Sequence, residues 1–224
     1  MKNYKLWMIL TTVMLWMSSV QAQSINWGSL DSADKHILHV NAGLEHGAVF
    51  GIGYGYQINN KLFPMVANME YSFPAGENIF DDLKTKVGVQ VSWIEIEHFQ
   101  FSTKINGVIR RYENDNVRLV NFGSDLTGVI GYYRTKWFVA TEVGFDKAII
   151  THFKHSELYM EEFPGVSDGW YGPTTGGNFY YGVQAGYSFG QHDTYVKAGR
   201  MLTQDFKTAP TLPMYGQVGY NIRF

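Results

Sequence analysis

The sequence predicts an all-β protein: a single antiparallel up-and-down transmembrane β-barrel, with ten strands as the expected number and eight as the alternative. Three observations lead to this prediction. Apolar and polar residues alternate with a period of two along most of the chain, short and long connections alternate between these segments, and aromatic residues gather near both ends of the apolar faces. A period of two is the pattern of a strand with one apolar face, and the other two features are typical of membrane barrels.

The composition favours strands and turns over helices. The 224 residues include 24 Gly, 15 Tyr, 15 Phe and 6 Trp but only 6 Pro, a bias toward residues that are common in strands and turns. Lys plus Arg number 18 against 20 Asp plus Glu, so there is no electrostatic reason to expect a nucleic-acid partner. The chain has no cysteine, which excludes disulfides, thiolate metal sites, a cysteine nucleophile and a lipidated cysteine.

The N-terminus has the pattern of a cleaved signal peptide. Lys2 and Lys5 precede an apolar run over residues 6–17, and Val20 and Ala22 offer small side chains at the positions that a signal peptidase reads. The run is too short for the roughly 20 residues that a membrane-spanning helix needs. We therefore expect cleavage after Ala22 and three regions: a signal peptide at 1–22, an N-terminal periplasmic segment at 23–35 and the barrel at 36–224.

Ten segments carry the alternation. In the last one, Val218, Tyr220 and Ile222 share one face, while Asn221 and Arg223 share the other. Because the sequence ends on this strand, we expect its last residue to be structural. The ten predicted strands are 36–45, 48–58, 61–72, 84–94, 97–110, 118–133, 136–149, 178–189, 193–202 and 214–224.

The segment at 193–202 has the least regular alternation. Its outward set is expected to begin with Val196 and Ala198 and to continue into Arg200. A charged residue in this set weakens the pattern, so the register of this strand is the least defined of the ten.

The connections between these strands alternate in length. Long ones are expected at 203–213, 150–177, 111–117 and 73–83, and short ones lie between them. Membrane barrels have short turns on the periplasmic side and longer loops outside, and an even number of strands returns both termini to the periplasm. A tight turn near 45–47 makes the number even; without it, 36–58 would be one strand and the termini would lie on opposite sides.

Aromatic residues on the apolar faces are sorted by height. One set lies beside the short turns and the terminus, as expected of one aromatic girdle, and a second set lies toward the opposite ends of the strands. The first set is Tyr56, Trp93, Phe99, Tyr132, Trp137, Phe189 and Phe224, and the second is Phe50, Tyr71, Phe122, Phe145 and Phe179.

The terminal strand "YGQVGYNIRF", with Tyr220, Ile222 and Phe224 on one face, resembles the last strand of small bacterial outer-membrane β-barrels. Together with the signal peptide and the alternating strands, the resemblance covers nearly all of the mature chain and points to the OmpA/OmpX-like class. It implies a Gram-negative outer membrane and recognition of Tyr220, Ile222 and Phe224 as an assembly signal by the barrel assembly machinery. The alternative is that Phe224 is only a girdle aromatic. The resemblance leaves the function open.

The inward faces carry charges of both signs and many glycines. Because a small barrel is filled by its own side chains and isolated charges are costly there, we expect the charges to pair across the lumen and close it. The alternative is a narrow pore. Glycines on the same face, including those of "GIGYGY", relieve crowding inside strands and do not form a nucleotide loop. The predicted charge network is Glu70, Lys86, Lys104, Arg110, Asp125, Glu142, Asp146, Lys197 and Arg223.

The longest outer loop, 150–177, carries the candidate recognition residues His152, His155, Trp170 and Tyr171. Their aromatic composition suits contact with a glycan or a protein, while the alternative is that Trp170 and Tyr171 fold over the barrel mouth. His155 with its neighbours Ser156 and Glu157 is a poor catalytic triad, because a triad is assembled from residues separated in sequence. Two histidines without a spaced third ligand are a weak metal signal.

We therefore expect a non-enzymatic outer-membrane barrel with a closed lumen, acting structurally or through its outer loops. No catalytic residue, metal or cofactor is expected. Its partners would be outer-membrane lipid, the assembly machinery during biogenesis and a surface ligand that the sequence does not identify. The alternatives are a membrane-embedded hydrolase that acts on lipid or peptide at the outer rim, and a narrow pore.

Overall fold

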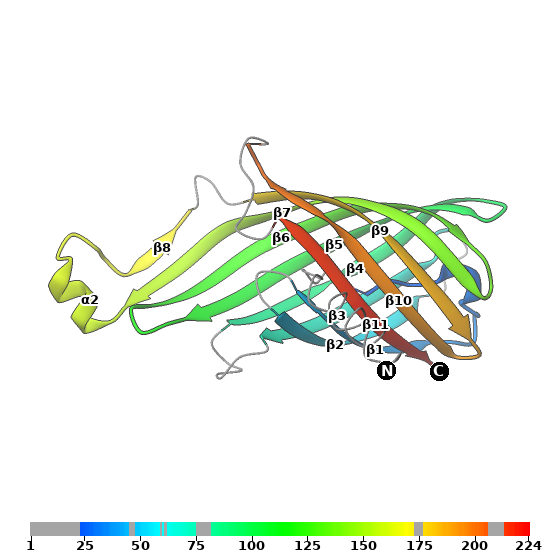
Figure 1. Cartoon of the computed structure of the whole chain (residues 1–224), viewed down its shortest axis with the longest axis horizontal. Coiled ribbons are helices and arrows are strands. Elements are labelled where there is room, and N and C mark those ends of the chain that lie inside the picture. Colours follow the sequence, from blue (N-terminus) through cyan, green and yellow to red (C-terminus); the bar gives the residue numbers. More distant parts are fainter. Residues whose placement is uncertain are drawn as a thin grey trace, which may run out of the picture.

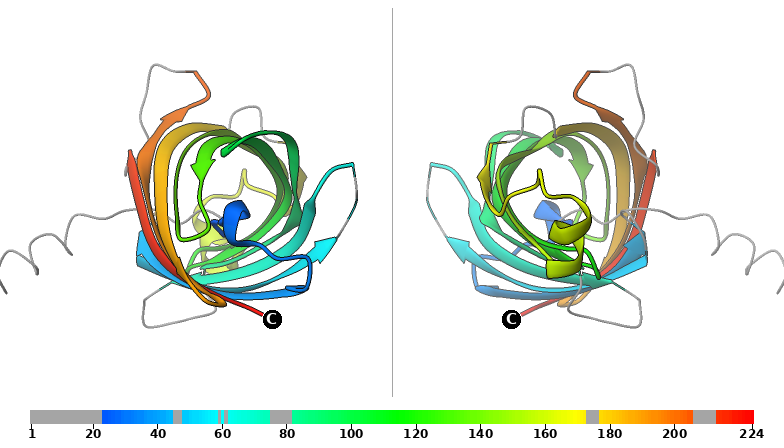
Figure 2. Two further views of the ribbon diagram at one scale, coloured as in Figure 1. Left: turned by 90° about the vertical axis from the view of Figure 1, so that its right-hand side faces the viewer. Right: turned by 90° about the vertical axis from the view of Figure 1, so that its left-hand side faces the viewer.

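The computed structural model describes residues 23–44, 48–58, 60, 62–74, 82–172, 177–205 and 213–224. Ten antiparallel strands form a closed barrel, as the end-on views of Figure 2 show. Each strand pairs with its neighbours in sequence, β6 pairs with β7, and β1 pairs with β11 to close the ring. The barrel strands are β1 (His36–Leu44), β2 (Ala48–Ile58), β3 (Met65–Pro74), β4 (Asp82–Ile96), β5 (Phe99–Glu113), β6 (Val117–Tyr133), β7 (Trp137–His155), β9 (Gly177–Phe189), β10 (His192–Thr203) and β11 (Met214–Arg223).

Three short elements complete the structure. The 3-10 helix η1 (Trp27–Ser29) precedes β1, while α2 (Glu157–Glu162) and β8 (Gly169–Tyr171) follow β7. β8 pairs with the distal end of β7. Over the part of the chain that the structure describes, no helix has the length and apolar character needed to cross a membrane.

The predicted ten-stranded fold is confirmed, and the eight-stranded alternative is wrong. Most predicted strand ends agree with the structure within a few residues, but β7 continues to His155 instead of ending at 149, and α2 and β8 were not predicted. β1 and β2 pair as an antiparallel hairpin. The turn predicted at 45–47 and the signal peptide predicted at 1–22 lie outside the described residues.

The alternation sorts side chains as expected, with apolar residues outside and polar residues inside. The outward Ile52, Ile105 and Val183 are 53%, 52% and 55% exposed. The expected register of β10 is also correct: Val196 and Ala198 face outward, and Arg200 is exposed in the same set. A protein with an apolar exterior and a polar interior is inverted relative to a water-soluble domain.

β5, β6 and β7 extend beyond the other strands, and a β-bulge interrupts the pairing of β6 with β7 where the extension begins. Phe122 pairs with Ile150 and Gly123 pairs with Ala148, so Ile149 has no residue opposite it. An extra residue in one strand bends the strand and shifts which side chains face outward. We call residues 111–122 and 149–171 the projecting extension; it includes α2 and β8 and reaches well past the barrel mouth (Figure 1).

The N-terminal segment enters the barrel. Residues 23–35 were expected as a separate segment on the periplasmic side, but the structure places the first five inside the lumen, where Gln23, Ser24 and Asn26 are buried. Figure 2 shows η1 within the ring of strands. At the same end of the barrel, the Phe224 carbonyl accepts hydrogen bonds from the main-chain N–H groups of Lys35 and His36 at 3.0 and 2.9 Å.

Candidate functional site

The polar groups of the N-terminal segment bond to several barrel strands from inside. We call residues 23–30 the lumen segment. Buried polar groups need such partners, because an unmade hydrogen bond away from water is costly. The hydrogen bonds join Lys104 Nζ to the Gln23 carbonyl at 2.9 Å, Ser24 Oγ to Gln184 Oε1 at 2.5 Å, Asn221 Nδ2 to the Ser24 carbonyl at 2.8 Å, and Asn26 Nδ2 to Ser188 Oγ at 2.7 Å and to the Arg134 carbonyl at 3.0 Å.

Two apolar residues of the same segment build a small hydrophobic core inside the barrel. Ile25 and Trp27 are buried. Tyr133 and Phe138, which also belong to this core, stack at 5.5 Å between ring centroids. The segment therefore fills its half of the lumen by apolar packing as well as by hydrogen bonds. The other members are Ile37, Val66, Val129, Ala140 and Tyr195.

Arg223 binds the C-terminal end of the lumen segment. Its guanidinium donates to Asp34 Oδ2 at 2.9 Å, to the Gly190 carbonyl at 2.7 Å and to the Ser29 carbonyl, and it lies 3.3 Å from Asp193. A planar guanidinium with five donors suits such a crowded site. The penultimate residue of the chain thus joins the last strand to the segment that precedes the first strand.

Two buried ion pairs and one imidazole–carboxylate hydrogen bond lie along the middle of the lumen wall. Lys86 lies 2.7 Å from Asp125, Lys197 lies 3.0 Å from Glu142, and His39 lies 2.9 Å from Glu70. Each pair joins two strands that are separated by one other strand: β4 with β6, β10 with β7, and β1 with β3. Pairs of opposite sign reduce the cost of burying each charge.

Tyrosines reach these carboxylates over glycines. Tyr215, Gly199, Gly182 and Glu142 are successive partners across β11, β10, β9 and β7. The Tyr215 hydroxyl donates to Glu142 Oε1 at 2.8 Å. A Cβ at Gly182 would lie 2.4 Å from the Tyr215 hydroxyl oxygen, so the glycine provides the space in which the ring lies.

A second tyrosine uses the same arrangement. Tyr180 lies over Gly144, where a Cβ would approach its ring at 2.2 Å. Its hydroxyl donates to Asp125 at 2.5 Å and lies 2.5 Å from the Thr127 hydroxyl. The glycines on the inward face therefore form grooves that hold buried tyrosines.

The nine residues predicted as one charge network occupy three places. Glu70, Lys86, Asp125, Glu142 and Lys197 lie in the middle of the lumen, together with Lys104, whose hydrogen bond goes to a main-chain carbonyl. Arg110 binds Asp82 near the outer mouth, with Nε 2.7 Å from Oδ1, and Asp146 accepts from the Asn178 main-chain N–H at 2.8 Å. Arg223 lies at the opposite end.

Sequence reasoning missed two kinds of lumen residue. His39 lies on the inward set of β1 and is 2% exposed, so the period of two would have identified it. The lumen segment gave no such signal, because its residues do not alternate. Its docking depends on how the finished lumen is shaped.

A cavity of about 330 Å³ opens at the outer mouth. Lys84, Arg110 and Lys147 contribute cationic groups to its lining, and Asp146 contributes a carboxylate. Tyr112, Asn121 and Asn178 are among its other lining residues. A second cavity, of about 560 Å³, lies at the opposite end of the barrel beside Gly28 of the lumen segment.

The four predicted recognition residues lie on the projecting extension but on two faces of it. Trp170 pairs with His152 and their rings meet edge to face at 4.9 Å, while Tyr171 meets Phe153 edge to face at 5.6 Å. Trp170 also contacts Phe122, which places it on the outward face. Neighbouring residues of a strand point to opposite faces, so Trp170 and Tyr171 do not act as a pair.

Tyr171 and His155 line a cleft of about 270 Å³ on the other face of the extension. His155 stacks on Tyr159 at 5.5 Å, and its Nδ1 lies 3.0 Å from Asp168. Hydrogen bonds from the main-chain N–H and the imidazole of His155 lower the pKa of Asp168 below its ordinary value of 3.8. The cleft also borders Phe153, Gly165, Val166 and Ser167.

The side chain of Ser156, next to His155, is occupied as a helix cap. Its hydroxyl accepts from the Tyr159 main-chain N–H at 3.3 Å at the start of α2. Among the described residues, no group of three or more His, Cys, Asp or Glu side chains is placed to hold a metal ion. The extension thus offers aromatic faces and hydrogen-bonding groups.

The predicted assembly residues occupy the outer surface at the closing seam. Ile222 and Phe224 are exposed, and the Phe224 ring stacks on His36 at 5.3 Å. The Tyr220 hydroxyl lies 2.7 Å from His192 Nδ1. All three face away from the lumen, on the strand that closes the ring.

The fold and these features define a class: a closed ten-stranded antiparallel barrel with an apolar exterior and a lumen that the N-terminal segment enters. No family model and no curated protein matches the chain. Solved structures that align with it include the KdgM porin in complex with a disordered oligogalacturonate, at 12% identity and TM-score 0.43 over 84% of this chain and 99% of that one. The NanC porin aligns at 8% identity and TM-score 0.45 over 84% of this chain and 97% of that one.

Proposed function

We propose that this chain is a bacterial outer-membrane β-barrel with a closed lumen that acts at the cell surface through its projecting extension. The apolar exterior supports the membrane location: large apolar side chains are exposed all around the ring, and two aromatic bands border them. Such a surface is a liability in water and is what a lipid-facing barrel requires. The terminal strand then serves as the signal for the barrel assembly machinery.

The observation that carries the closed-lumen proposal is the burial of residues 23–27 inside the barrel. On the outer side of this segment, paired charges and buried tyrosines occupy the cross-section, and Lys86, Lys197 and Tyr180 are each at most 5% exposed. A conducting pore needs a continuous wet path, which these groups obstruct. The lumen therefore stabilises the barrel and does not conduct.

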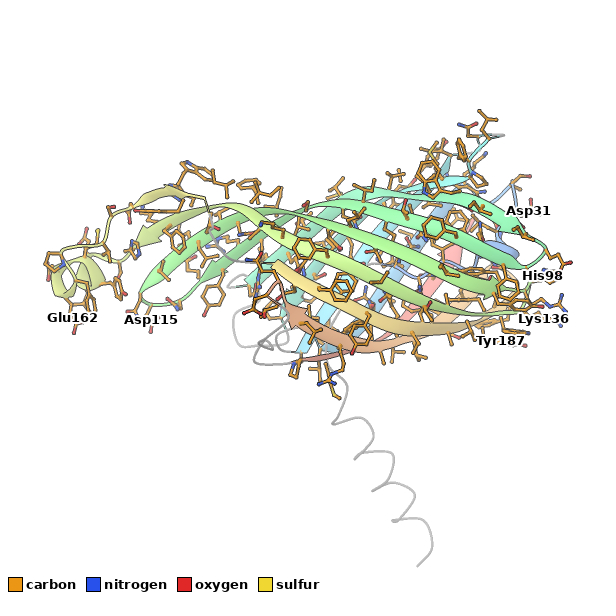
Figure 3. All side chains as sticks on the ribbon, turned by 90° about the horizontal axis from the view of Figure 1, so that it is seen from above. Asp31, His98, Asp115, Lys136, Glu162 and Tyr187 are labelled. Carbon is orange, nitrogen blue, oxygen red and sulfur yellow. The ribbon has the colours of Figure 1, made fainter. Side chains whose placement is uncertain are left out.

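The projecting extension supports a role in recognition. Its tip, marked by Asp115 and Glu162, lies at the opposite end of the molecule from His98 and Lys136, as Figure 3 shows. The aromatic cleft at Tyr171 and His155 combines ring faces with hydroxyl and imidazole groups, a combination that suits a saccharide. The ligand would therefore be a saccharide of the surrounding surface.

A narrow pore is the second candidate, and one specific observation favours it. The lumen segment is covalently continuous with the described wall only through β1, and a cavity with three cationic side chains, Lys84, Arg110 and Lys147, lies beyond the ion pairs. Withdrawal of the segment would open its side of the lumen, where both polar and apolar side chains line the wall. The membrane-embedded hydrolase has less support, because the side chain of Ser156 caps α2.

Conductance in a planar bilayer tests the closed lumen. The unmodified mature protein should show little or no steady conductance, and deletion of residues 23–30 should raise conductance. The matched control Ser24→Ala removes one side-chain hydrogen bond but keeps the segment, and should stay closed. A large, stable conductance in the unmodified protein would refute the closed lumen and favour the narrow pore.

An array of immobilised saccharides tests the surface role. The purified protein should bind to some of the saccharides, and Tyr171→Ala should weaken this binding. Ile149→Ala, on the same extension but away from the cleft, is the control and should bind normally. If the protein is retained on none of the saccharides, or if both variants bind like the unmodified protein, the saccharide role of the cleft is refuted.

A further inference from the structure

Gln23, the first residue that the structure describes, lies inside the lumen. It is 2% exposed, and its carbonyl accepts a 2.9 Å hydrogen bond from Lys104 Nζ. Its side chain lies against apolar wall: a Cβ at Gly55 would meet Val66 at 3.1 Å and Gln23 Oε1 at 3.2 Å. Gln23 is also the first residue after the cleavage site expected from Val20 and Ala22.

The side-chain amide of Gln23 is poorly accommodated in this place. Its Nε2 and Oε1 atoms are buried and have no hydrogen-bond partner among the residues that the structure describes. Val66 and Ile37, close to this amide, are both 0% exposed and apolar. Two unmade hydrogen bonds in such surroundings are unfavourable, and a native structure rarely keeps them without a reason.

A free α-ammonium group on Gln23 would be unfavourable as well. The hydrogen bond from Lys104 and the standard span from N to O of one residue put the amine no more than about 6.5 Å from the Lys104 ammonium. Like charges at this distance repel strongly where water is scarce.

Among the residues that the structure describes, the middle of the lumen holds no spare carboxylate to offset this charge. The three carboxylates in its middle already have cationic or imidazole partners. Glu70 pairs with His39, Asp125 pairs with Lys86, and Glu142 pairs with Lys197.

We propose that Gln23, as the N-terminus left by cleavage after Ala22, is closed to a pyroglutamyl lactam. The α-amine nitrogen attacks Cδ of its own side chain, a new C–N bond forms, the Cδ–Nε2 bond breaks, and ammonia leaves. The reaction needs no oxidant, reductant or cofactor. It removes the amine charge and the buried primary amide together, and it keeps the Gln23 carbonyl that binds Lys104.

The modification would precede insertion, because the buried residue is closed off once the barrel is complete. A neutral, compact ring then occupies the space bounded by Gly55, Ile37 and Val66. The lumen segment would thus be sealed by a terminal group that carries no charge. This inference rests on the proposed cleavage site but not on the closed-lumen function.

Intact-mass measurement of the protein purified from outer membranes tests the proposal. The expected mass is that of residues 23–224 less one molecule of ammonia, with stepwise N-terminal sequencing blocked until the unfolded chain is treated with pyroglutamyl aminopeptidase. The full mass of residues 23–224, with sequencing that starts at free Gln23, would overturn the lactam but leave the cleavage site intact. A chain that starts at another residue would overturn both.

Gln23→Glu is the matched control, since a carboxylate closes to the lactam far less readily than an amide. The variant should show the full mass of its residues 23–224 and an open N-terminus. Ammonia loss that persists in this variant would assign the loss to another residue and refute the proposal. The temperature at which the variant loses its heat-modified gel mobility should also be lower, because both its amine and its new carboxylate are charged groups buried in the lumen.

Discussion

The Tyr215 hydroxyl donates a 2.8 Å hydrogen bond to the Glu142 carboxylate although two strands lie between these residues. The contact is possible because Gly199 and Gly182, the residues in register between them, leave the inner wall bare. The hydrogen bond therefore depends on glycines that take no part in it. The interior of this barrel thus contains contacts along the wall as well as contacts across it.

Replacing Gly182 by Ala should destabilise the barrel. The new Cβ would lie 2.4 Å from the Tyr215 hydroxyl oxygen and 2.5 Å from the Ala198 carbonyl oxygen, so the ring must move and Glu142 loses a donor. The expected loss is about 1–3 kcal/mol in the free energy of unfolding, measured by urea titration in lipid vesicles. Gly107→Ala is the control: its nearest contact is 3.8 Å away, and the variant should be close to neutral. If the two variants are equally stable, Gly182 does not provide the space that the Tyr215 ring needs.

Lys197→Met should destabilise the protein more than Lys104→Met. The first leaves Glu142 buried without its cation, which costs about 3–5 kcal/mol. The second leaves the Gln23 carbonyl without its donor, which costs about 1–3 kcal/mol, because the hydrogen bond from Lys104 goes to the main chain. The same urea titration compares them, and the reverse order would argue against these assignments.

A double variant provides the control for this comparison. Glu142→Gln in the Lys197→Met background removes the uncompensated charge and keeps an acceptor for Tyr215. It should recover part of the lost stability. If the double variant is as unstable as the sum of the single ones, the two residues do not interact.

The sequence predicted the strands of the barrel wall well but did not predict what lies inside the lumen, and the reasons are physical. Outward positions are mostly apolar, so even the register of β10, in which Arg200 follows Val196 and Ala198 on the outward face, could be derived from alternation. The bulge at Ile149 lies in the run "AII", where apolar neighbours hide the change of face. The lumen segment has no periodic pattern, because its position depends on polar groups that many strands bring together.

Protonation of Asp168 should loosen the tip of the projecting extension at low pH. Its pKa lies below 3.8 because it accepts hydrogen bonds from the main-chain N–H and the imidazole of His155. A lowered pKa means that the carboxylate stabilises the fold above pH 3.8 and that this contribution disappears as the pH falls through the lower folded value. NMR titration of the Asp168 carboxyl carbon in nanodiscs should give a midpoint below 3.8.

His155→Ala is the control for this titration. It removes the imidazole donor but keeps the main-chain donor, so the midpoint should move partway back toward 3.8. A midpoint at or above 3.8 in the unmodified protein would show that the pair does not form in solution.

Lysine substitutions should reveal where the lipid ends. Val183 and Ile149 are similarly exposed, at 55% and 58%, but Val183 lies near the middle of β9 while Ile149 lies at the start of the projecting extension. Val183→Lys should cost about 2–4 kcal/mol, as at a bilayer midplane, and Ile149→Lys about 0–1 kcal/mol. Unfolding from vesicles measures both. If both substitutions reduce the free energy of unfolding equally, either the extension is embedded in lipid or the barrel itself is not.

Two changes at Phe224 separate its two roles. Deletion removes its carbonyl, which accepts from Lys35 and His36, and its N–H, which donates to the His36 carbonyl at 3.0 Å. Phe224→Ala keeps these main-chain groups and removes only the ring. If the assembly machinery reads the terminal aromatic, both variants should be exported normally but should yield less heat-modifiable protein in the outer membrane.

Phe189→Ala supplies the comparison, because Phe189 is an exposed aromatic of the same girdle at 47% against 51% for Phe224 but lies at the end of β9 and not at the end of the chain. Its loss should reduce stability slightly and leave the amount of assembled protein unchanged. Should Phe224→Ala behave like Phe189→Ala while the deletion alone fails, Phe224 closes the seam between β1 and β11 and carries no assembly signal.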